Sequence, residues 1–396
     1  MQNLSKNLSL NFKFIIRCLT IGSTVFGGLA MISYLKEEFV SRKRYVAEED
    51  FLKGIALTQL LPGPIMINLV GYVGYRRFGF LSGLIGALAL VFPSVILISI
   101  LAYFYKSINI ATIDVLFHGL KPFVVAFFVW AFLNFYRRYV DINFGRILLL
   151  LCFVFYMIGI NIFLVFLLSF FISIFFRDFL PKGSVFSNVV SEQKLYIPKI
   201  ELIIGITAIS LLIISAYIIT PNLIPFYFKI TQISFLAFGG AQVALPLYQK
   251  TFVDSMKLIS QENFLDAIVL SQVTPGPILC ITSFIGFFIG SFSAAIFSFL
   301  FTFVPSIVFT IIVSPFYERI SHLSWIRGGI FGLLVALTGL LASMSVNYFP
   351  MAVKDPLSFF FLLIFLVGLY RKVNIVLLIS VAILGSFILF GVFHLY

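Results

Sequence analysis

Apolar residues run in long stretches along the chain, and short charged or Pro-containing breaks separate one stretch from the next. A helix needs about 20 apolar residues to cross a bilayer, and most of the stretches are near that length. The fifth, sixth and twelfth stretches are short for a crossing, so they can instead form re-entrant or tilted half-helices. The pattern predicts thirteen candidate membrane helices, at residues 13–34, 50–75, 79–104, 112–136, 144–158, 160–176, 198–219, 226–249, 263–288, 290–314, 324–346, 355–370 and 372–394.

The chain contains an internal repeat at a shift of 212 to 213 residues, which is the sign of a duplicated unit. Four pairs of segments match in order: Phe26-Gly27-Gly28 with Phe238-Gly239-Gly240, Glu49-Asp50-Phe51-Leu52 with Glu262-Asn263-Phe264-Leu265, Pro62-Gly63-Pro64 with Pro275-Gly276-Pro277, and Pro93-Ser94 with Pro305-Ser306. The sequence therefore predicts an N-terminal repeat at 1–180, a charged linker with a connecting helix at 181–222, and a C-terminal repeat at 223–396.

Each repeat then holds six predicted helices, and the seventh helix joins them. An odd number of crossings between equivalent elements turns one repeat upside down relative to the other. Inverted repeats are a common build of secondary transporters, in which two similar units alternate between inward and outward openings. The expected fold class is an all-α polytopic membrane protein with two inverted repeats and broken helices.

Composition agrees with a membrane protein and narrows the functional class. Hydrophobic residues make up 61% of the chain and charged residues 11%, which excludes an ordinary globular enzyme and a disordered chain. The net charge of +12 would suggest a nucleic-acid partner in a soluble protein. In a polytopic protein it indicates Lys and Arg in cytoplasmic loops, so we expect the lipid bilayer and no nucleic acid as partner. Most loop cations then favour a multi-pass protein of the plasma (inner) membrane with its N-terminus in the cytoplasm and its C-terminus outside. The loop at 36–50 disagrees with this assignment.

The two Pro-Gly-Pro segments are the first candidates for chemistry, because each interrupts an apolar stretch. Proline removes a backbone donor and glycine permits unusual backbone angles, so the helix must break there. A broken helix within a membrane needs protein or water around it, and its exposed N–H groups suit an anion. A purely structural kink is the alternative. The predicted substrate-binding residues at the breaks are Pro62, Gly63, Pro64, Pro275, Gly276 and Pro277.

Glycine pairs and a few polar side chains accompany the breaks. The Gly-Gly pairs weaken their helices and expose backbone N–H groups, although close helix approach explains such pairs equally well. Hydroxyl and amide groups near the breaks could bind oxygens of a tetrahedral oxyanion, or could hydrogen-bond between helices. These additional candidates are Gly27, Gly28, Thr58, Gln59, Asn68, Gly239, Gly240, Gln272 and Thr274.

Ionisable residues within apolar stretches are costly and indicate function by default. Arg17, Lys121, Lys229 and Asp266 are in such positions. Lys121 could attract an anion or pair with Asp114, and snorkelling to the interface is the alternative. The three His and three Cys show no metal-ligand spacing, and no catalytic motif is present, so we expect no cofactor, no metal and no enzyme activity.

The motifs together resemble the chromate ion transporter family. Phe26-Gly27-Gly28 in the first predicted helix, Gln59 and Pro62-Gly63-Pro64 in the second, and Pro93 in the third carry the resemblance, and the second half repeats them. The likeness is to the long, two-domain members and spans nearly the whole chain. It departs after Gly28 and Gly240, where Leu29-Ala30-Met31 and Ala241-Gln242-Val243 stand in place of the Pro and polar or His residue common in the family.

The resemblance implies a carrier that exports chromate from the cytoplasm, with sulfate as the structural analogue, and hence chromate resistance. We therefore predict a secondary transporter that holds an oxyanion at the broken helices. A carrier for sulfate or another anion, including one that imports it, and a passive anion channel remain alternatives. A homodimer is only the default expectation for the assembly.

Overall fold

The structure is a computed structural model, and it describes residues 2–25, 29–107, 120–140, 143–176, 198–237, 241–317, 323–371, 373 and 375–386. Its secondary structure is helical, as predicted. The helices form two compact units, and each unit draws on both halves of the sequence. The first unit contains residues 1–101, 183–244 and 274–322, and the second contains 102–182, 245–273 and 323–396.

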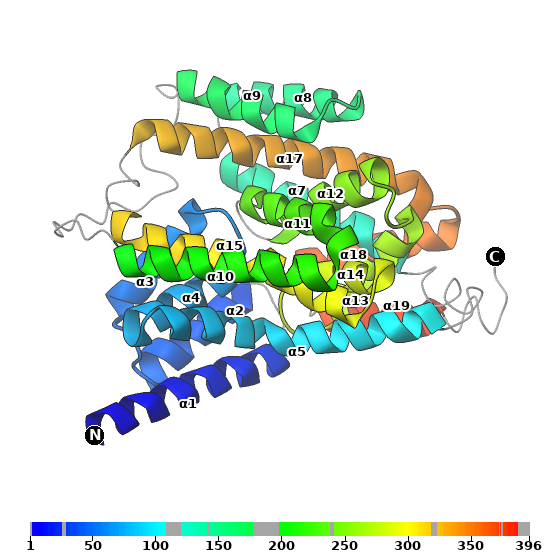
Figure 1. Ribbon diagram of the computed structural model, residues 1–396. Helices are drawn as coiled ribbons and strands as arrows, with labels where there is room; N and C mark the ends of the chain where they lie inside the picture. The colour runs from blue at the N-terminus through cyan, green and yellow to red at the C-terminus, as the bar shows by residue number, and fades with distance from the viewer. Residues whose placement is uncertain are drawn as a thin grey trace. The chain divides into compact units, whose positions relative to one another are not determined.

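In the first unit, α15 packs against α4, α10, α11 and α14. Figure 1 shows α10 lying along α15. The α14–α15 pair is tight because Gly286 has no side chain, and an added Cβ would lie 2.7 Å from the carbonyl oxygen of Ala294. The elements of this unit are α1 (Gln2–Thr24), α2 (Leu29–Lys36), η1 (Glu37–Arg42), α3 (Glu48–Leu60), α4 (Ile65–Phe78), most of α5 (Phe80–Ser107), α10 (Lys199–Ile219), η3 (Pro221–Leu223), α11 (Ile224–Leu236), η5 (Ile278–Cys280), α14 (Ile281–Ile289), α15 (Phe292–Val313) and η6 (Ser314–Phe316).

In the second unit, the long helix α17 contacts α7, α8 and α9, and α18 packs on α7. Gly339 lets α17 approach α8, because an added Cβ would lie 3.0 Å from Cβ of Cys152. The elements of this unit are the end of α5, α7 (Lys121–Tyr139), α8 (Asn143–Met157), α9 (Ile162–Phe175), the second half of α12 (Ala241–Tyr248), η4 (Gln249–Ser255), α13 (Gln261–Val273), α17 (Ser324–Ala352), α18 (Pro356–Tyr370) and α19 (Ile375–Ser386).

Four of the described helices are long and apolar enough to cross a membrane: Phe80–Ser107, Lys199–Ile219, Phe292–Phe316 and Trp325–Ala352. The fifth, sixth and twelfth predicted helices are short, as expected, since α8, α9 and α18 have 15, 14 and 15 residues. The chain is thus a multi-pass membrane protein, and the number of crossings stays a prediction.

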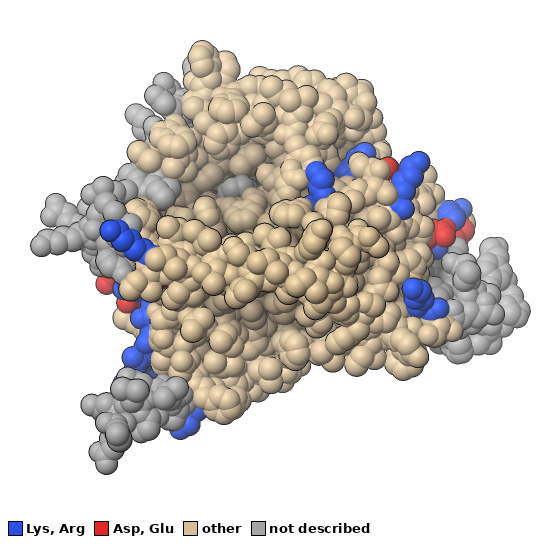
Figure 2. Space-filling model, in the orientation of Figure 1, with Lys and Arg blue, Asp and Glu red and all other residues tan. Residues whose placement is uncertain are grey.

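The connecting helix α10 carries the clearest surface for lipid. Ile203, Ile206, Leu211 and Ile218 are each more than half exposed. The surface over the middle of α10 is uncharged in the view of Figure 2. An apolar surface of this kind is stable when lipid tails cover it, and in water it would be a liability.

Four of the predicted helices are each made of two shorter helices. The stretch at 13–34 ends its first helix at Thr24 and starts the next at Leu29, and the stretch at 226–249 does the same between Leu236 and Ala241. The stretches at 50–75 and 263–288 are interrupted at their Pro-Gly-Pro segments. These interruptions occupy matching places in the two halves, as expected for a duplicated chain.

A pair of π-helices, η1 and η4, occurs at matching places in the two halves, and the sequence analysis did not predict it. Backbone hydrogen bonds between residues five positions apart close both, from Lys43 N to Glu38 O (2.9 Å) and from Met256 N to Thr251 O (2.8 Å). Each is followed by a residue in the left-handed region, Arg44 with φ 50° and Lys257 with φ 52°. These residues are 213 positions apart, so the two halves share backbone detail as well as motifs.

Close contact between α1 and α5 depends on Gly22, which is buried. A Cβ at Gly22 would overlap the carbonyl oxygen of Leu90. We expect Gly22→Val to destabilise the protein by about 1–3 kcal/mol, the usual cost of overpacking. Thermal unfolding of the purified protein in detergent would measure this. Ser23→Ala is the matched control, because Ser23 is exposed and its hydroxyl donates within its own helix, to Leu19 O. Equal melting temperatures for the two variants would contradict the close contact.

Candidate functional site

The first Pro-Gly-Pro segment is a sharp break between α3 and α4. Gly63 has φ 112°, a region that side chains other than glycine rarely adopt. It is also enclosed, because an added Cβ would lie 2.8 Å from both Nδ2 of Asn68 and Cβ of Ser306. Backbone angle and space therefore both require glycine at this position.

The second Pro-Gly-Pro segment has the same form. α13 ends at Val273, and a helix resumes at Ile278 as η5 and continues as α14. Gly276 has φ 106°, close to the value at Gly63. An added Cβ at Gly276 would overlap the hydroxyl of Ser94. The predicted pair of broken helices is thus present, with matching geometry at both glycines.

Each break is contacted by a serine from the other half of the chain. Ser94, on α5 of the first half, donates a hydrogen bond to the carbonyl oxygen of Pro275. Ser306, on α15 of the second half, donates to Oδ1 of Asn68 at 3.2 Å. All of these residues belong to the first unit. The two serines follow the matching prolines Pro93 and Pro305, which lie inside their helices.

The sequence analysis did not include Ser94 and Ser306 among the candidate site residues. The available signal was the repeated Pro-Ser pair at the 212-residue shift. Sequence separation hid the contacts, because Ser94 lies 181 residues from Pro275 and Ser306 lies 238 residues from Asn68.

The helices that follow the two breaks begin in the same way. Pro64 is the N-cap of α4 and Pro277 is the N-cap of η5, and neither side chain can accept a hydrogen bond from the first turn. The first N–H groups of a helix have no partner inside it and carry the positive end of the helix dipole. Pro62, Ile65, Pro275 and Ile278 are half-buried. Both helix starts therefore offer backbone donors at positions that are not sealed in the core.

The polar side chains predicted beside the first break differ in their roles. Asn68 is fully buried, and its Nδ2 donates to the carbonyl oxygen of Pro62 at 3.3 Å. Thr58 is also buried, but its hydroxyl donates within α3, to Gly54 O at 2.9 Å. Gln59 is half-buried near the end of the same helix. Of the three, Asn68 is the one that the structure joins directly to the break.

Beside the second break, Gln272 and Thr274 are 7% and 2% exposed. Nε2 of Gln272 is buried with no hydrogen-bond partner among the described residues. A buried amide without a partner is costly and commonly marks a ligand or water position. A substrate contact for Gln272 stays a prediction that this amide favours.

Of the five remaining candidates, the structure describes one. Gly27, Gly28, Gly239 and Gly240 lie outside the described residues. Lys121 is the first residue of α7, is 9% exposed and belongs to the second unit. Its role in binding an anion stays a prediction.

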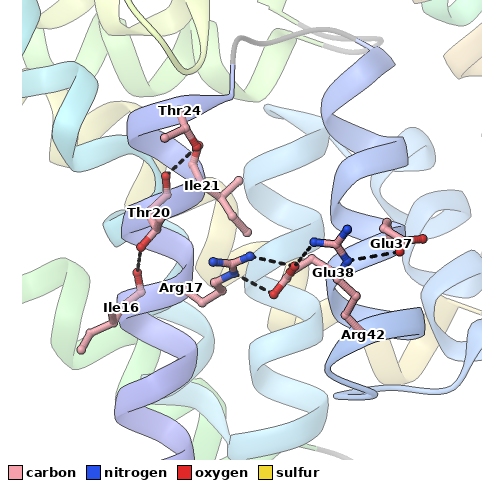
Figure 3. A network of polar contacts seen from close by, with 8 residues as sticks. All are labelled: Ile16, Arg17, Thr20, Ile21, Thr24, Glu37, Glu38 and Arg42. Atoms are coloured by element: carbon pink, nitrogen blue, oxygen red, sulfur yellow. Dashed lines mark hydrogen bonds and ion pairs between the residues drawn. The ribbon is translucent and has the colours of Figure 1, made fainter.

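Arg17, which the sequence marked as a charge within an apolar stretch, forms a two-pronged ion pair with Glu38 of η1. Nε and a terminal nitrogen of Arg17 lie 2.7 and 2.9 Å from the two carboxylate oxygens of Glu38. The Glu38 side chain is 1% exposed and that of Arg17 is 31% exposed. Figure 3 shows Arg17 and Arg42 both directed at Glu38, with Arg42 also reaching Glu37 at 3.3 Å. The hydrogen bond from Arg17 holds the pKa of the Glu38 carboxyl below its usual range.

Comparison with known proteins agrees with the resemblance drawn from the motifs. The chain is 28% identical to an uncharacterized transporter of Methanocaldococcus jannaschii, over 94% of this chain and 92% of that protein. It is 25% identical to a chromate transport protein of Pseudomonas aeruginosa, over 94% of this chain and 91% of that protein. It is 24% identical to a probable chromate transport protein of Synechococcus elongatus, over 89% and 88% of the two chains. No solved structure matches the chain.

The family profile described as chromate transporter matches twice, at residues 12–174 and 224–388. The two matches correspond to the two halves of the chain. Each half carries one Pro-Gly-Pro break and the serine, Ser94 or Ser306, that contacts the break of the other half. Together they cover well over half of the sequence. The chain belongs to the chromate transporter family.

Proposed function

We propose that this protein is a secondary carrier that exports chromate from the cytoplasm, binds the dianion at its two Pro-Gly-Pro breaks and thereby gives chromate resistance. The observation that carries the proposal is the pair of matching breaks, each followed by a helix with a proline N-cap. Helix starts of this kind are ready-made anion sites, because backbone N–H groups and the helix dipole both favour negative charge. Relatives named for chromate transport support the choice of ion.

The proposed transport cycle depends on the two homologous repeats. With the N-terminus in the cytoplasm of the inner membrane and the C-terminus outside, the repeats at 1–180 and 223–396 are inverted, and the connecting region at 181–222 joins them. Discontinuous helices at the interface of inverted repeats are a recurring substrate site in secondary transporters. The contact of each half with the other's break supports such an interface.

The direction of transport follows from charge. A membrane potential that is negative inside favours the exit of an anion by about 2.3 kcal/mol per charge for each 100 mV. Chromate carries two negative charges, so the membrane potential favours its exit by twice this free energy. Export can therefore be favourable without a coupled ion. Export against a chromate concentration that is much higher outside than inside would need additional coupling.

Sulfate is the second candidate substrate, because the proposed donors are backbone N–H groups. Such donors recognise the charge and the tetrahedral arrangement of oxygens, which chromate and sulfate share. Competition between the two ions is therefore part of the test.

The proposal is tested by counterflow in proteoliposomes that contain the purified protein and trapped unlabelled anion. We expect saturable uptake of labelled chromate that trapped chromate accelerates, and competition by external sulfate. Fast uptake of sulfate with none of chromate would make this a sulfate carrier. Unsaturable flux that trapped anion does not accelerate would indicate a passive channel. Failure of both ions to move, with a protein that still unfolds cooperatively, would refute oxyanion transport.

A further inference from the structure

We propose that Asn68 and Ser94 are positioning residues for the transported anion: each binds the carbonyl oxygen of a Pro-Gly peptide and keeps that oxygen from facing the anion. This inference rests on the proposed function, since it explains how a break made of backbone atoms can be selective for negative charge. Neither residue needs to touch the anion itself.

A helix break presents acceptors as well as donors. The N–H groups after the break attract an anion, but a carbonyl oxygen of the break repels one. The carbonyl oxygens of Pro62 and Pro275 are the two oxygens in question, because each immediately precedes the glycine with positive φ. A break therefore binds an anion well only if these oxygens are directed elsewhere and bonded there.

The structure shows where the oxygens are directed. Nδ2 of Asn68 donates to the oxygen of Pro62, and Oγ of Ser94 donates to the oxygen of Pro275. The described peptides are all trans, so the carbonyl and the following N–H of one peptide point in opposite directions. With the Pro62 oxygen turned to Asn68, the N–H of Gly63 is turned away from Asn68.

The carbonyl oxygen of Pro62 fixes the direction of the Asn68 amide, because a carbonyl oxygen only accepts and therefore faces Nδ2. Oδ1 of Asn68 then lies 3.2 Å from the hydroxyl of Ser306, whose one proton is also within reach of Phe303 O at 3.1 Å. Ser306 contacts the first break through Asn68.

The two breaks use different donors. Cys280 lies 212 residues after Asn68, at the matching position of the second half, and is buried. A thiol is a weak donor compared with an amide. At the second break Ser94 donates to the carbonyl oxygen, whereas at the first break Asn68 does so.

The test is counterflow of chromate and sulfate with Ser94→Ala and Asn68→Leu, each with a matched control. Ser99→Ala is the control for Ser94→Ala, because Ser99 is buried on the same helix and its hydroxyl donates within that helix, to Val95 O at 2.7 Å. Ser298→Ala controls for loss of a buried hydroxyl in the same unit, because the hydroxyl of Ser298 donates within its own helix α15, to Ala294 O at 2.7 Å. Leu is close to Asn in size but has no donor, so Asn68→Leu removes the bond and retains most of the volume.

We expect a rise of about three- to tenfold in the KM for both anions in Ser94→Ala and Asn68→Leu, the range for one lost hydrogen bond. The maximal rate and the melting temperature should stay near wild type, which a merely structural role would not produce. Ser99→Ala should keep the wild-type KM. If Ser94→Ala does not unfold cooperatively, Asn68→Leu decides the question.

The inference is overturned if wild type shows counterflow and the variants match their controls in KM. It is also overturned if only the melting temperature changes. Absence of counterflow in wild type would instead refute the proposed function, so the two failures are distinguishable.

Discussion

Gly63→Ala and Gly276→Ala are each expected to reduce the rate of chromate counterflow by at least about tenfold. The glycines have φ 112° and 106°, and forcing a side chain into such a backbone region costs about 1–3 kcal/mol. The added Cβ at Gly63 would also lie 2.8 Å from Ser306 Cβ, and the one at Gly276 would overlap Ser94. The backbone can relieve the unfavourable φ and the close contact of the added Cβ only by moving. That movement takes the break away from the residues that orient it. Since 1.4 kcal/mol is a factor of ten, the loss should be easy to measure in proteoliposomes.

Gly79→Ala is the matched control for these two variants. Gly79 has φ 92°, but an added Cβ has nothing within 4 Å. This variant has the same kind of backbone strain without the contact, so we expect a lower melting temperature and a counterflow rate within about twofold of wild type. Equal losses of rate in Gly79→Ala and Gly63→Ala would show that strain, and not the site, explains the effect.

Glu38→Gln is expected to destabilise the protein by about 2–4 kcal/mol. The variant removes one charge of a pair in which Glu38 is 1% exposed, and breaking a buried pair commonly costs about 3–5 kcal/mol. The Arg17 side chain keeps 31% exposure, so water recovers part of that cost. Glu37→Gln is the control, because Glu37 is 55% exposed where it pairs with Arg42, and an exposed pair contributes at most about 1 kcal/mol. Similar losses of stability in the two variants would contradict the importance of burial.

The same pair predicts a pH dependence with a definite sign. Arg17 lowers the pKa of Glu38 in the folded protein, so the pair contributes fully above the pKa of an unperturbed carboxyl. The contribution is lost as the pH falls through the lowered pKa. The difference in melting temperature between wild type and Glu38→Gln should therefore be largest near neutral pH and shrink in acid. A difference that grows in acid would contradict the ion pair.

Sequence reasoning predicted the broken helices because the cause is local. Proline and glycine determine backbone geometry wherever they occur, so Pro62-Gly63-Pro64 and its copy indicated the breaks without any tertiary information. The Gly-Gly pairs were expected to weaken their helices, and α1 ends at Thr24 and α11 at Leu236, shortly before these pairs. The all-helical class followed from the length of the apolar stretches.

The parts that sequence reasoning missed depend on contacts between distant segments. The apolar pattern gave no reason to pair Ser94 with Pro275 or Arg17 with Glu38, although each pair decides a local geometry. The π-helices were missed because their extra residue does not disturb a stretch that is already irregular in polarity. Thr58 was predicted to contact the ligand, and its hydroxyl donates within its own helix, to Gly54 O; a ligand contact for Thr58 stays a prediction.

All three cysteines of the chain, Cys18, Cys152 and Cys280, are buried, with at most 1% exposure. Chromate is a strong oxidant of thiols, and a thiol reacts only where its thiolate can be reached. If the proposed chromate site lies at the Pro-Gly-Pro breaks, the burial of Cys280, three residues after Pro277, keeps this reducing group from the oxidising cargo. Cysteines introduced along the route of the cargo for labelling would lack this shielding. Redox-inert sulfate is therefore the better ion for mapping the route by thiol chemistry.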